Sequence, residues 1–340
     1  MPMKTLTGIR VVEFDAIGPV PFAAMMLADH GAHVTRILRP GGHGIEVEAG
    51  DDDVLLRGRA ERRAIDLKTD AGRDEALALM AQADVVLEGH RPGVMERLGL
   101  GPDVAHARNP ALIYGRVTGY GQDGPMATWP GHDLNYISQV GALHPIGDPD
   151  LPPPPPLTHA GDFGGGGMLG AFGVLAALLH ARATGEGAVI DIAMVDGAAL
   201  LMSLYAGMRK AGLWSDTRGA NLLDGAAPFY RCYRTKDGAH IAIGAIEPQF
   251  YAALRKALKL DDPLFDAQMD RARWPEMCAV IAARIGAMTL ADLEPLLSTP
   301  DACATRVLPL GMVSESPQVA AREIFRDGAP QPAPRIAPAK

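Results

Sequence analysis

The chain has 340 residues, of which 48% are hydrophobic and 21% are charged, so a wholly disordered protein is excluded and about two domains are expected. Its 32 basic and 40 acidic side chains give a net charge of −8, which argues against a general nucleic-acid binder. Three scattered cysteines without a CxxC pair indicate neither a zinc site nor a disulfide framework, which is typical of a reducing cytoplasm.

No stretch approaches the roughly 18 uninterrupted apolar residues that define a membrane span. The N-terminal segment also lacks the apolar region of a signal peptide, because Arg10, Glu13 and Asp15 interrupt it. We therefore expect a cytoplasmic protein without a membrane partner.

The first part of the chain alternates predicted strands and helices. An apolar run at 9–14 predicts a buried strand, and a helix at 22–30 and a second strand at 33–38 follow it. The alternation of strands and helices continues with a helix at 74–83 and strands at 84–88 and 112–117. A helix of small residues that ends near Gly185 and a strand at 188–193 follow. Repeated βαβ units predict a parallel sheet, so the fold class is α/β with a Rossmann-like large domain.

The dinucleotide fingerprint is missing from this domain. After the first predicted strand the chain reads DAIGPVPF instead of GxGxxG, and prolines cannot donate N–H groups to a pyrophosphate. NAD or FAD is therefore not expected. The sequence also contains no GxSxG elbow and no Walker A motif, which disfavours hydrolase and P-loop functions.

A second, smaller domain is expected after about residue 221. Runs at 229–234 and 240–245 alternate around Lys236-Asp237-Gly238, which is typical of a β-hairpin. Helices are expected near 250–258 and 275–288. The predicted domains are a large domain at 1–195 completed by 311–340, a linker helix at 196–224 and a small α+β domain at 225–310. The prolines at 152–156 predict a surface loop.

Two segments carry the strongest chemical signal, GHDLNY at 131–136 and GDFGGGG at 161–167. Both lie at predicted helix starts, where free N–H groups and a positive dipole favour a carboxylate or a developing oxyanion. Either Asp162 and His132 take part in chemistry there, or Asp162 only caps a helix and His132 is only a satisfied polar residue. Glu247, at the end of the second hairpin strand, is either solvated or orients a histidine.

A basic cluster in the first hundred residues has two interpretations. It is either a solvated charged face or a set of forks for the phosphates of a small ligand. Its members are Arg36, Arg39, Arg57, Arg59, Arg62, Arg63, Lys68, Arg91 and Arg97. Three methionines, Met194, Met202 and Met208, are either core residues or the lining of an adaptable apolar pocket.

Several segments together carry a resemblance over nearly the whole chain. They include GIRVVEF, PFAAMMLADHGAHVTRILRP, VVLEGHRPGVMERLGLGP, TGYGQDGP, GHDLNYIS, GDFGGGGMLG, DTRGANLLDGAAPFY and GAIEPQFYAAL. In this combination the chain resembles the family III CoA-transferase (CaiB/BaiF-like) superfamily, and within it the α-methylacyl-CoA racemases. The resemblance implies an interlocked, ring-like homodimer, with each active site between the large domain of one subunit and the small domain of the other.

The resemblance also implies a reaction, which is the interconversion of (R)- and (S)-2-methylacyl-CoA thioesters by 1,1-proton transfer through an enolate. His132 and Asp162 would stand on opposite faces of Cα, and Glu247 would orient His132. Tyr136 would hydrogen-bond Asp162, and the backbone N–H of Asp133 would meet the enolate oxygen. No metal and no separate cofactor are implied, because CoA arrives as part of the substrate.

The acyl-CoA is expected to contact a set of residues that match the family by motif position. These are Arg39, Ile65, Asp66, Leu67, Lys68, Gly89, His90, Arg91, Arg97, Gly131, Leu134 and Asn135. The arginines would pair with the phosphates of CoA.

Two alternatives stay open beside the racemase. Asp162 also matches the nucleophile of the CoA transferases, which move CoA between carboxylic acids, so this residue does not discriminate. The GHD at 131–133 favours the racemase, since transferases usually carry an aromatic residue before the aspartate. A third possibility is an acyl-CoA binder without catalytic activity. As a racemase, the protein would act in the degradation of branched-chain fatty acids or sterol side chains.

Overall fold

The computed structural model describes residues 3–41, 53–297 and 300–339. The chain packs into two compact units, unit 1 with residues 1–143, 155–203 and 326–340, and unit 2 with residues 144–154 and 204–325. The chain thus passes between the units near residues 143, 154, 203 and 325, whereas the predicted domain bounds lie at 195, 225 and 310.

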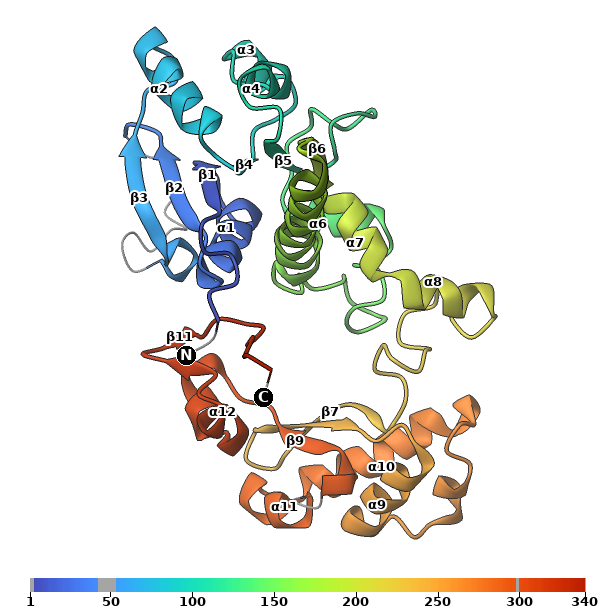
Figure 1. The fold of residues 1–340 in the computed structure, drawn as a ribbon. Helices are drawn as coiled ribbons and strands as arrows, with labels where there is room; N and C mark the ends of the chain where they lie inside the picture. Colours follow the sequence, from blue (N-terminus) through green and yellow to red (C-terminus); the bar gives the residue numbers. More distant parts are fainter. Residues whose placement is uncertain (1–2, 42–52, 298–299, 340) are drawn as a thin grey trace. The chain divides into compact units, whose positions relative to one another are not determined.

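Unit 1 is built on a sheet of six parallel strands (Figure 1). The strands are β1 (Arg10–Phe14), β2 (His33–Leu38), β3 (Arg59–Ala64), β4 (Val85–Glu88), β5 (Ile113–Thr118) and β6 (Ala188–Ala193). Their order in the sheet is β3-β2-β1-β4-β5-β6, which is the order of a doubly wound, Rossmann-like sheet. The prediction of a parallel α/β sheet is confirmed.

Helices cover both faces of this sheet. One apolar core contains residues of α1 (Pro19–Asp29) and α6 (Leu169–Thr184), and the other contains residues of α2 (Asp70–Ala81), α3 (Val94–Arg97) and α4 (Pro102–Arg108). Burial on both sides explains why the central strands β1, β4 and β5 are mostly apolar. Unit 1 also contains α5 (Asp133–Gln139), α7 (Met194–Leu201), the short 3₁₀-helix η2 (Val54–Leu56) and the π-helix η3 (His159–Met168).

Two arginines of the basic cluster are buried inside the sheet. Arg36 on β2 places Nη1 2.8 Å from Glu13 Oε1, and Arg59 on β3 places Nε 2.7 Å from Glu13 Oε2. Arg36 Nη2 also lies 2.7 Å from Asp15 Oδ1. The side chains of Arg36 and Glu13 are 1% and 0% exposed. For Arg36 and Arg59, both interpretations of the basic cluster are therefore wrong, because these side chains join β1, β2 and β3.

The edge strand β3 was not predicted. Its sequence, RAERRA, has no apolar run, and charged residues are typical of an edge strand that must not pair with another chain. The buried pair between Arg59 and Glu13 provides the attachment to β1 that apolar side chains provide elsewhere in the sheet.

One helical stretch of unit 1 is long and apolar enough to span a membrane. It covers His159–Thr184, with a mean hydropathy of 1.5, and 39% of its most apolar part is buried. The sequence alone predicts no membrane span here, because Asp162, several glycines and His180 interrupt its apolar residues. A core helix of a soluble protein passes the same test, so this single helix is weak evidence for a membrane.

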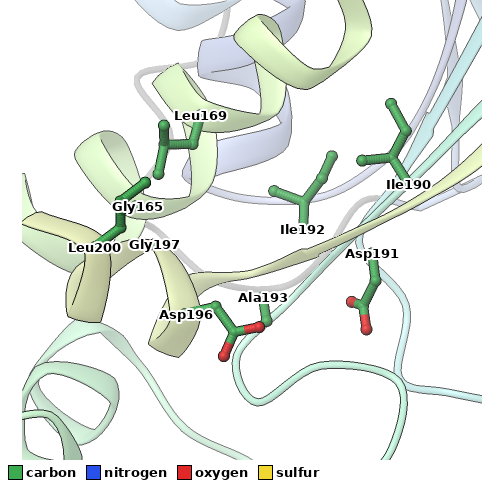
Figure 2. A pocket seen from close by; sticks show the side chains of 9 residues that line it. All are labelled: Gly165, Leu169, Ile190, Asp191, Ile192, Ala193, Asp196, Gly197 and Leu200. Carbon is green, nitrogen blue, oxygen red and sulfur yellow. The ribbon is translucent and has the colours of Figure 1, made fainter. Parts of the chain in front are cut away.

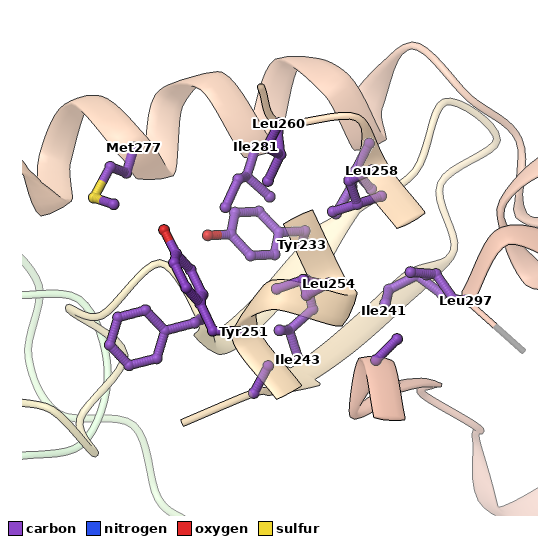
Figure 3. Packing of buried hydrophobic residues seen from close by; sticks show 14 of the residues in the cluster. Tyr233, Ile241, Ile243, Tyr251, Leu254, Leu258, Leu260, Met277, Ile281 and Leu297 are labelled. Carbon is purple, nitrogen blue, oxygen red and sulfur yellow. The ribbon is translucent and has the colours of Figure 1, made fainter. Parts of the chain in front are cut away.

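Unit 2 contains a three-stranded antiparallel sheet covered by helices. Its strands are β7 (Tyr230–Arg234), β8 (His240–Gly244) and β9 (Ala304–Arg306), and β7 and β8 form the predicted hairpin. The helices include α9 (Pro248–Leu258), α10 (Trp274–Gly286), α11 (Leu290–Leu297) and α12 (Pro317–Ala321). Tyr233, Ile241, Leu254 and Ile281 belong to its apolar core (Figure 3). Unit 2 therefore combines an antiparallel sheet with helices.

The predicted linker helix at 196–224 is shorter than expected. Helix α7 ends at Leu201, α8 (Ser203–Lys210) follows, and the chain then turns at Gly212, whose φ is +73°. The loop beyond is held by the buried Asn221, whose Oδ1 accepts from the Ser215 amide at 2.7 Å. The short strands β10 (Phe325–Arg326) and β11 (Ala329–Pro330) follow α12.

The buried charge network of the sheet yields a first prediction. We expect Arg36→Met to lower the free energy of unfolding by about 3–5 kcal/mol, because Glu13 and Asp15 then lose a buried counter-charge. Urea denaturation measures the effect. The control Arg63→Met removes a half-exposed pair with Glu61 on β3 and should leave the unfolding midpoint within experimental error. If the two variants lowered the free energy of unfolding equally, the buried network would contribute no more to stability than the exposed pair.

Candidate active site

The strand order of the sheet reverses between β1 and β4, and ligands of such sheets bind beyond the carboxyl ends of the strands at this point. Here Gly89, directly after β4, lies against the turn between β1 and α1. A Cβ at Gly89 would stand 2.9 Å from Ala16 Cβ and 3.1 Å from Val20 Cγ2. Only a glycine lets these two loops approach so closely.

Eight of the twelve predicted CoA-binding residues directly follow the carboxyl ends of parallel strands of the sheet. Arg39 comes after β2, residues 65–68 after β3 and residues 89–91 after β4, while Arg97 ends α3. They therefore follow one edge of the sheet. Within this set, Ile65 is buried in the core beside α2, so its side chain serves packing.

A buried carboxylate anchors the segment that carries Arg91 and Arg97. Glu88 Oε2 accepts a hydrogen bond from the His90 amide at 2.7 Å, and Oε1 accepts one from Arg116 Nε at 3.1 Å. Arg116 in turn pairs with Glu96 of α3 at 2.8 Å. Burial raises the pKa of Glu88 to about 7. Glu88 and Arg116 were not among the predicted site residues, although each is a single charge in an otherwise apolar segment, VVLE or IYGRVT.

Helix α5 begins where the GHD motif predicts a helix start. His132 is its exposed N-cap residue, and the His132 amide donates to Asn135 Oδ1 at 3.1 Å. Asp133 is the first helical residue, so its amide has no acceptor within the helix. No other acceptor for this amide lies among the described residues. The position thus offers a free N–H group beside an exposed imidazole.

The side chain of Asp133 joins α5 to η3. Its Oδ1 accepts hydrogen bonds from the amides of Gly161 at 2.6 Å and Asp162 at 2.8 Å. Its Oδ2 is buried and has no hydrogen-bond partner in the part of the chain that the structure describes. The two predicted chemical segments, far apart in sequence, therefore meet through this carboxylate.

Asp162 lies in the first turn of η3, half-buried, and its carboxylate has no hydrogen-bond partner among the described residues. The interpretation of Asp162 as a helix cap is therefore wrong. Burial, and then the negative charge of Asp133, raise the pKa of Asp162 to about 6. A Cβ at Gly18, the residue before α1, would stand 3.6 Å from Asp162 Oδ2. Asp162 is thus an unpaired carboxyl group beside the turn that follows β1.

Tyr136 has a different acceptor from the predicted one. Its hydroxyl donates to the carbonyl oxygen of Gly131, so it does not donate to Asp162. The ring is wedged in place, because a Cβ at Gly119 or Gly131 would stand 2.2 or 2.8 Å from Tyr136 Cε1. Burial and the nearby charge of Asp162 raise the pKa of Tyr136. Tyr136 therefore lies near Asp162 without holding it.

The glycines after Asp162 serve close packing of helices. A Cβ at Gly165 would stand 2.8 Å from the Ala198 nitrogen and 2.9 Å from the Met194 oxygen, and one at Gly167 would stand 2.6 Å from Phe22 Cδ1. They let α7 and α1 pack directly on η3. Met194 is buried, which confirms its interpretation as a core residue, whereas Met202 and Met208 are half-buried.

A separate hollow of about 180 Å³ lies between η3, α6, β6 and α7 (Figure 2). Its lining is Gly165, Leu169, Ile190, Asp191, Ile192, Ala193, Asp196, Gly197 and Leu200. Asp191 Oδ2 accepts from the Gln122 amide at 2.9 Å. None of the predicted site residues lines this hollow, so it is distinct from the group around Asp162.

Glu247 belongs to unit 2. It is the exposed N-cap residue of α9, and its carbonyl oxygen accepts from the Tyr251 amide at 2.9 Å. Its predicted role beside His132 stays a prediction, and the same holds for the assignment of Leu134, an exposed residue of α5, to the ligand.

The sequence pattern of CoA-transferase family III matches residues 6–337 of the chain. A match of this length, over a doubly wound sheet with a carboxylate at its switch point, shows that the chain belongs to this family.

Individual proteins similar to the chain include racemases and a probable transferase. The chain is similar to the α-methylacyl-CoA racemases of Mus musculus and Homo sapiens, with 42% identity to each, over 98% and 97% of this chain and 86% of each relative. Its fold is similar to the crystal structure of Rv3272 from Mycobacterium tuberculosis, with a TM-score of 0.78 and 30% identity over 95% of this chain and 88% of that one. That protein is described as a probable fatty acyl-CoA transferase.

The packing of η3 yields a second prediction. We expect Gly165→Ala to destabilise the protein by about 1–3 kcal/mol, because the new methyl group meets the backbone of α7 and not a flexible side chain. Thermal and urea unfolding measure the loss. The control Gly207→Ala in α8 has open space around the new methyl group and should be neutral or slightly stabilising. A neutral Gly165→Ala would show that η3 can shift at no cost.

Proposed function

We propose that this chain interconverts (R)- and (S)-2-methylacyl-CoA thioesters by proton transfer at Cα. The observation that carries the proposal is Asp162, an unpaired, half-buried carboxyl group whose pKa is raised to about 6. A carboxyl group with such a pKa both accepts and donates a proton near neutral pH, which a reversible racemisation requires. The similarity to two racemases over nearly the full chain supports the same reaction.

The reaction is written as two proton transfers. In one direction Asp162 takes the α-proton, the Cα–H bond breaks, and its electron pair passes into the thioester to form an enolate. Protonated His132 then delivers a proton to the opposite face of Cα, and the electron pair returns to form the new Cα–H bond. In the other direction the two residues exchange roles, so the composition of the thioester does not change.

The free amide of Asp133 is the proposed donor to the enolate oxygen. It stands at the start of α5, where the helix dipole adds positive potential. Arg39, Arg91 and Arg97 are the proposed contacts for the phosphates of CoA. CoA enters as part of the substrate, and the proposal involves neither a metal nor a separate cofactor.

We expect the activity to serve the degradation of branched-chain fatty acids or sterol side chains in the cytoplasm. In the proposed assembly, Glu247 from the small domain of a second copy orients His132. The proton transfer itself does not require a particular acyl group. The preferred acyl length is therefore to be measured with thioesters of different lengths.

The test of the activity uses (S)-2-methylacyl-CoA in D₂O, with NMR detection of the α-proton and no added acid acceptor. We expect loss of the α-proton signal together with appearance of the R epimer. His132→Ala should slow the epimerisation by about 10²–10⁴-fold, because one of the two proton carriers is lost. The control His33→Ala removes a half-exposed histidine at the amino end of β2, away from the carboxyl edge of the sheet, and should leave the rate unchanged.

A different outcome would favour the transferase. If wild-type protein exchanges no α-proton but moves CoA to an added carboxylic acid, Asp162 acts as a nucleophile and the racemase proposal is wrong. The similarity to a probable fatty acyl-CoA transferase makes this arm of the experiment necessary. Tight acyl-CoA binding without either reaction would instead indicate a binding protein.

A homodimer is part of the same proposal. One face of α6 exposes large apolar side chains, with Phe172 68% and Leu179 73% exposed and Leu175 between them. Monomeric proteins rarely expose contiguous apolar surface of this kind. A second copy of the chain is the proposed cover for it.

Light scattering at micromolar concentration measures the assembly. We expect a mass of twice 35.9 kDa for the wild type. Leu179→Glu places a charge on the apolar face of α6 and should shift the mass toward a single chain. A wild-type mass of a single chain would overturn both the dimer and the proposed action of Glu247 in a second subunit.

A further inference from the structure

The side chain of Asp133 has no role in the reaction as proposed above, which uses only its backbone amide. We propose that its buried carboxylate is a positioning residue for Asp162, one that fixes the backbone of η3 at Asp162 and directs an uncompensated negative charge at the Asp162 carboxyl group. This inference rests on the proposed function, because it concerns how Asp162 is prepared for proton transfer.

The geometry of the attachment is specific. A single oxygen, Asp133 Oδ1, accepts from two successive amides, those of Gly161 and Asp162, at 2.6 and 2.8 Å. The close approach depends on Gly161, where a Cβ would stand 2.6 Å from the same oxygen. The first turn of η3 is therefore fixed to α5, which also carries His132, so the two proton carriers are held by one rigid connection.

The second carboxylate oxygen, Oδ2, shows that the two hydrogen bonds alone do not explain why residue 133 is an aspartate. Asp133 is 2% exposed, and its Oδ2 has no partner among the described residues. An asparagine would offer one oxygen to the same two amides without burying a charge, and burial of an unpaired charge is costly. Burial of this charge costs free energy, and the hydrogen bonds to Gly161 and Asp162 do not explain why a charged residue stands here.

The other groups around Asp162 leave its charge unopposed. Tyr136 donates elsewhere, and α1 begins with Gly18 and Pro19, so its first residue has no N–H group to donate. The charge of Arg91 lowers the pKa of Tyr136, although burial raises that pKa by more. On α7 the charged residue is Asp196, which is exposed at the separate hollow. Asp133 is therefore the nearby charge that raises the pKa of Asp162 beyond the effect of burial.

A direct test follows the carboxyl ¹³C signal of Asp162 as the pH is changed, in wild type and in Asp133→Asn. The variant keeps an oxygen for the two amides and removes the charge. We expect the midpoint of the Asp162 titration to fall by about one pH unit. This readout needs no substrate, so it stands whether or not the protein proves to be a racemase.

The control is Asp84→Asn, in the same unit. Asp84 Oδ2 also accepts from a backbone amide, that of Arg10, at 2.7 Å, but Asp84 lies at the amino end of β4. We expect it to leave the Asp162 titration unchanged. An equal titration of Asp162 in wild type and Asp133→Asn, with both proteins folded, would overturn the proposal.

The rate of α-proton exchange gives a second readout. For the substrate hand whose proton Asp162 takes, the acid limb of the pH–rate profile should move down with the titration in Asp133→Asn. Asp133→Ala removes both hydrogen bonds as well, so its rate on the plateau should fall further than that of Asp133→Asn. If Asp133→Asn lowers the rate equally at all pH values, the role of Asp133 is only structural and the proposal is wrong.

A second variant covers the case in which Asp133→Asn does not fold. Asp133→Ser also removes the buried negative charge and leaves a small polar side chain at the start of α5, so it should lower the midpoint of the Asp162 titration in the same direction. An unchanged Asp162 midpoint in folded Asp133→Ser would overturn the proposal. Absence of α-proton exchange in wild type, with the shift of the Asp162 titration still observed in the variant, would overturn only the proposed racemase activity.

Discussion

The two hydrogen bonds that Asp133 accepts from Gly161 and Asp162 connect parts of the chain that the sheet alone would leave independent. The sheet brings the turn after β1 and the loop after β4 to its switch point, and helix α5 and the π-helix η3 pack beside them. Without these hydrogen bonds, His132 and Asp162 would lie on separate elements, and no side-chain contact described here would fix their positions relative to each other. With it, an exposed imidazole, a free amide and an unpaired carboxyl group belong to one rigid assembly.

The π-helix η3 is the second constraint on this assembly. π-helices are rare and are frequently found at functional sites. Here the wider helix is packed against α1 and α7 through glycines, since a Cβ at Gly165 or Gly166 would meet their atoms within 3 Å. The glycine run therefore supports the position of Asp162, because it is the surface on which α1 and α7 pack.

Much of the sheet could be predicted from the sequence, because β1, β2 and β6 are apolar runs bounded by turn residues. Edge strand β3 could not, because its attachment depends on Arg59 meeting Glu13, two charged residues far apart in the chain. The helix start at His132 was predictable from its motif, but the acceptor of Tyr136 was not, since it depends on how Gly119 and Gly131 confine the ring. Charges inside apolar strands, such as Glu88, were visible signals that an apolar pattern search passes over.

Helix α1 begins with proline at its first and third positions, Pro19 and Pro21. The usual start of a helix presents several free amides that bind anions, and these prolines remove two of them beside the carboxyl group of Asp162. Amide-bearing residues in their place would form a permanent anion trap. Such a trap would hold Asp162 in its ionised form, and a proton carrier fixed in one form can work in only one direction. In the proposed racemase, the scarcity of free amides at the start of α1 would therefore leave Asp162 able to change its protonation state in both directions.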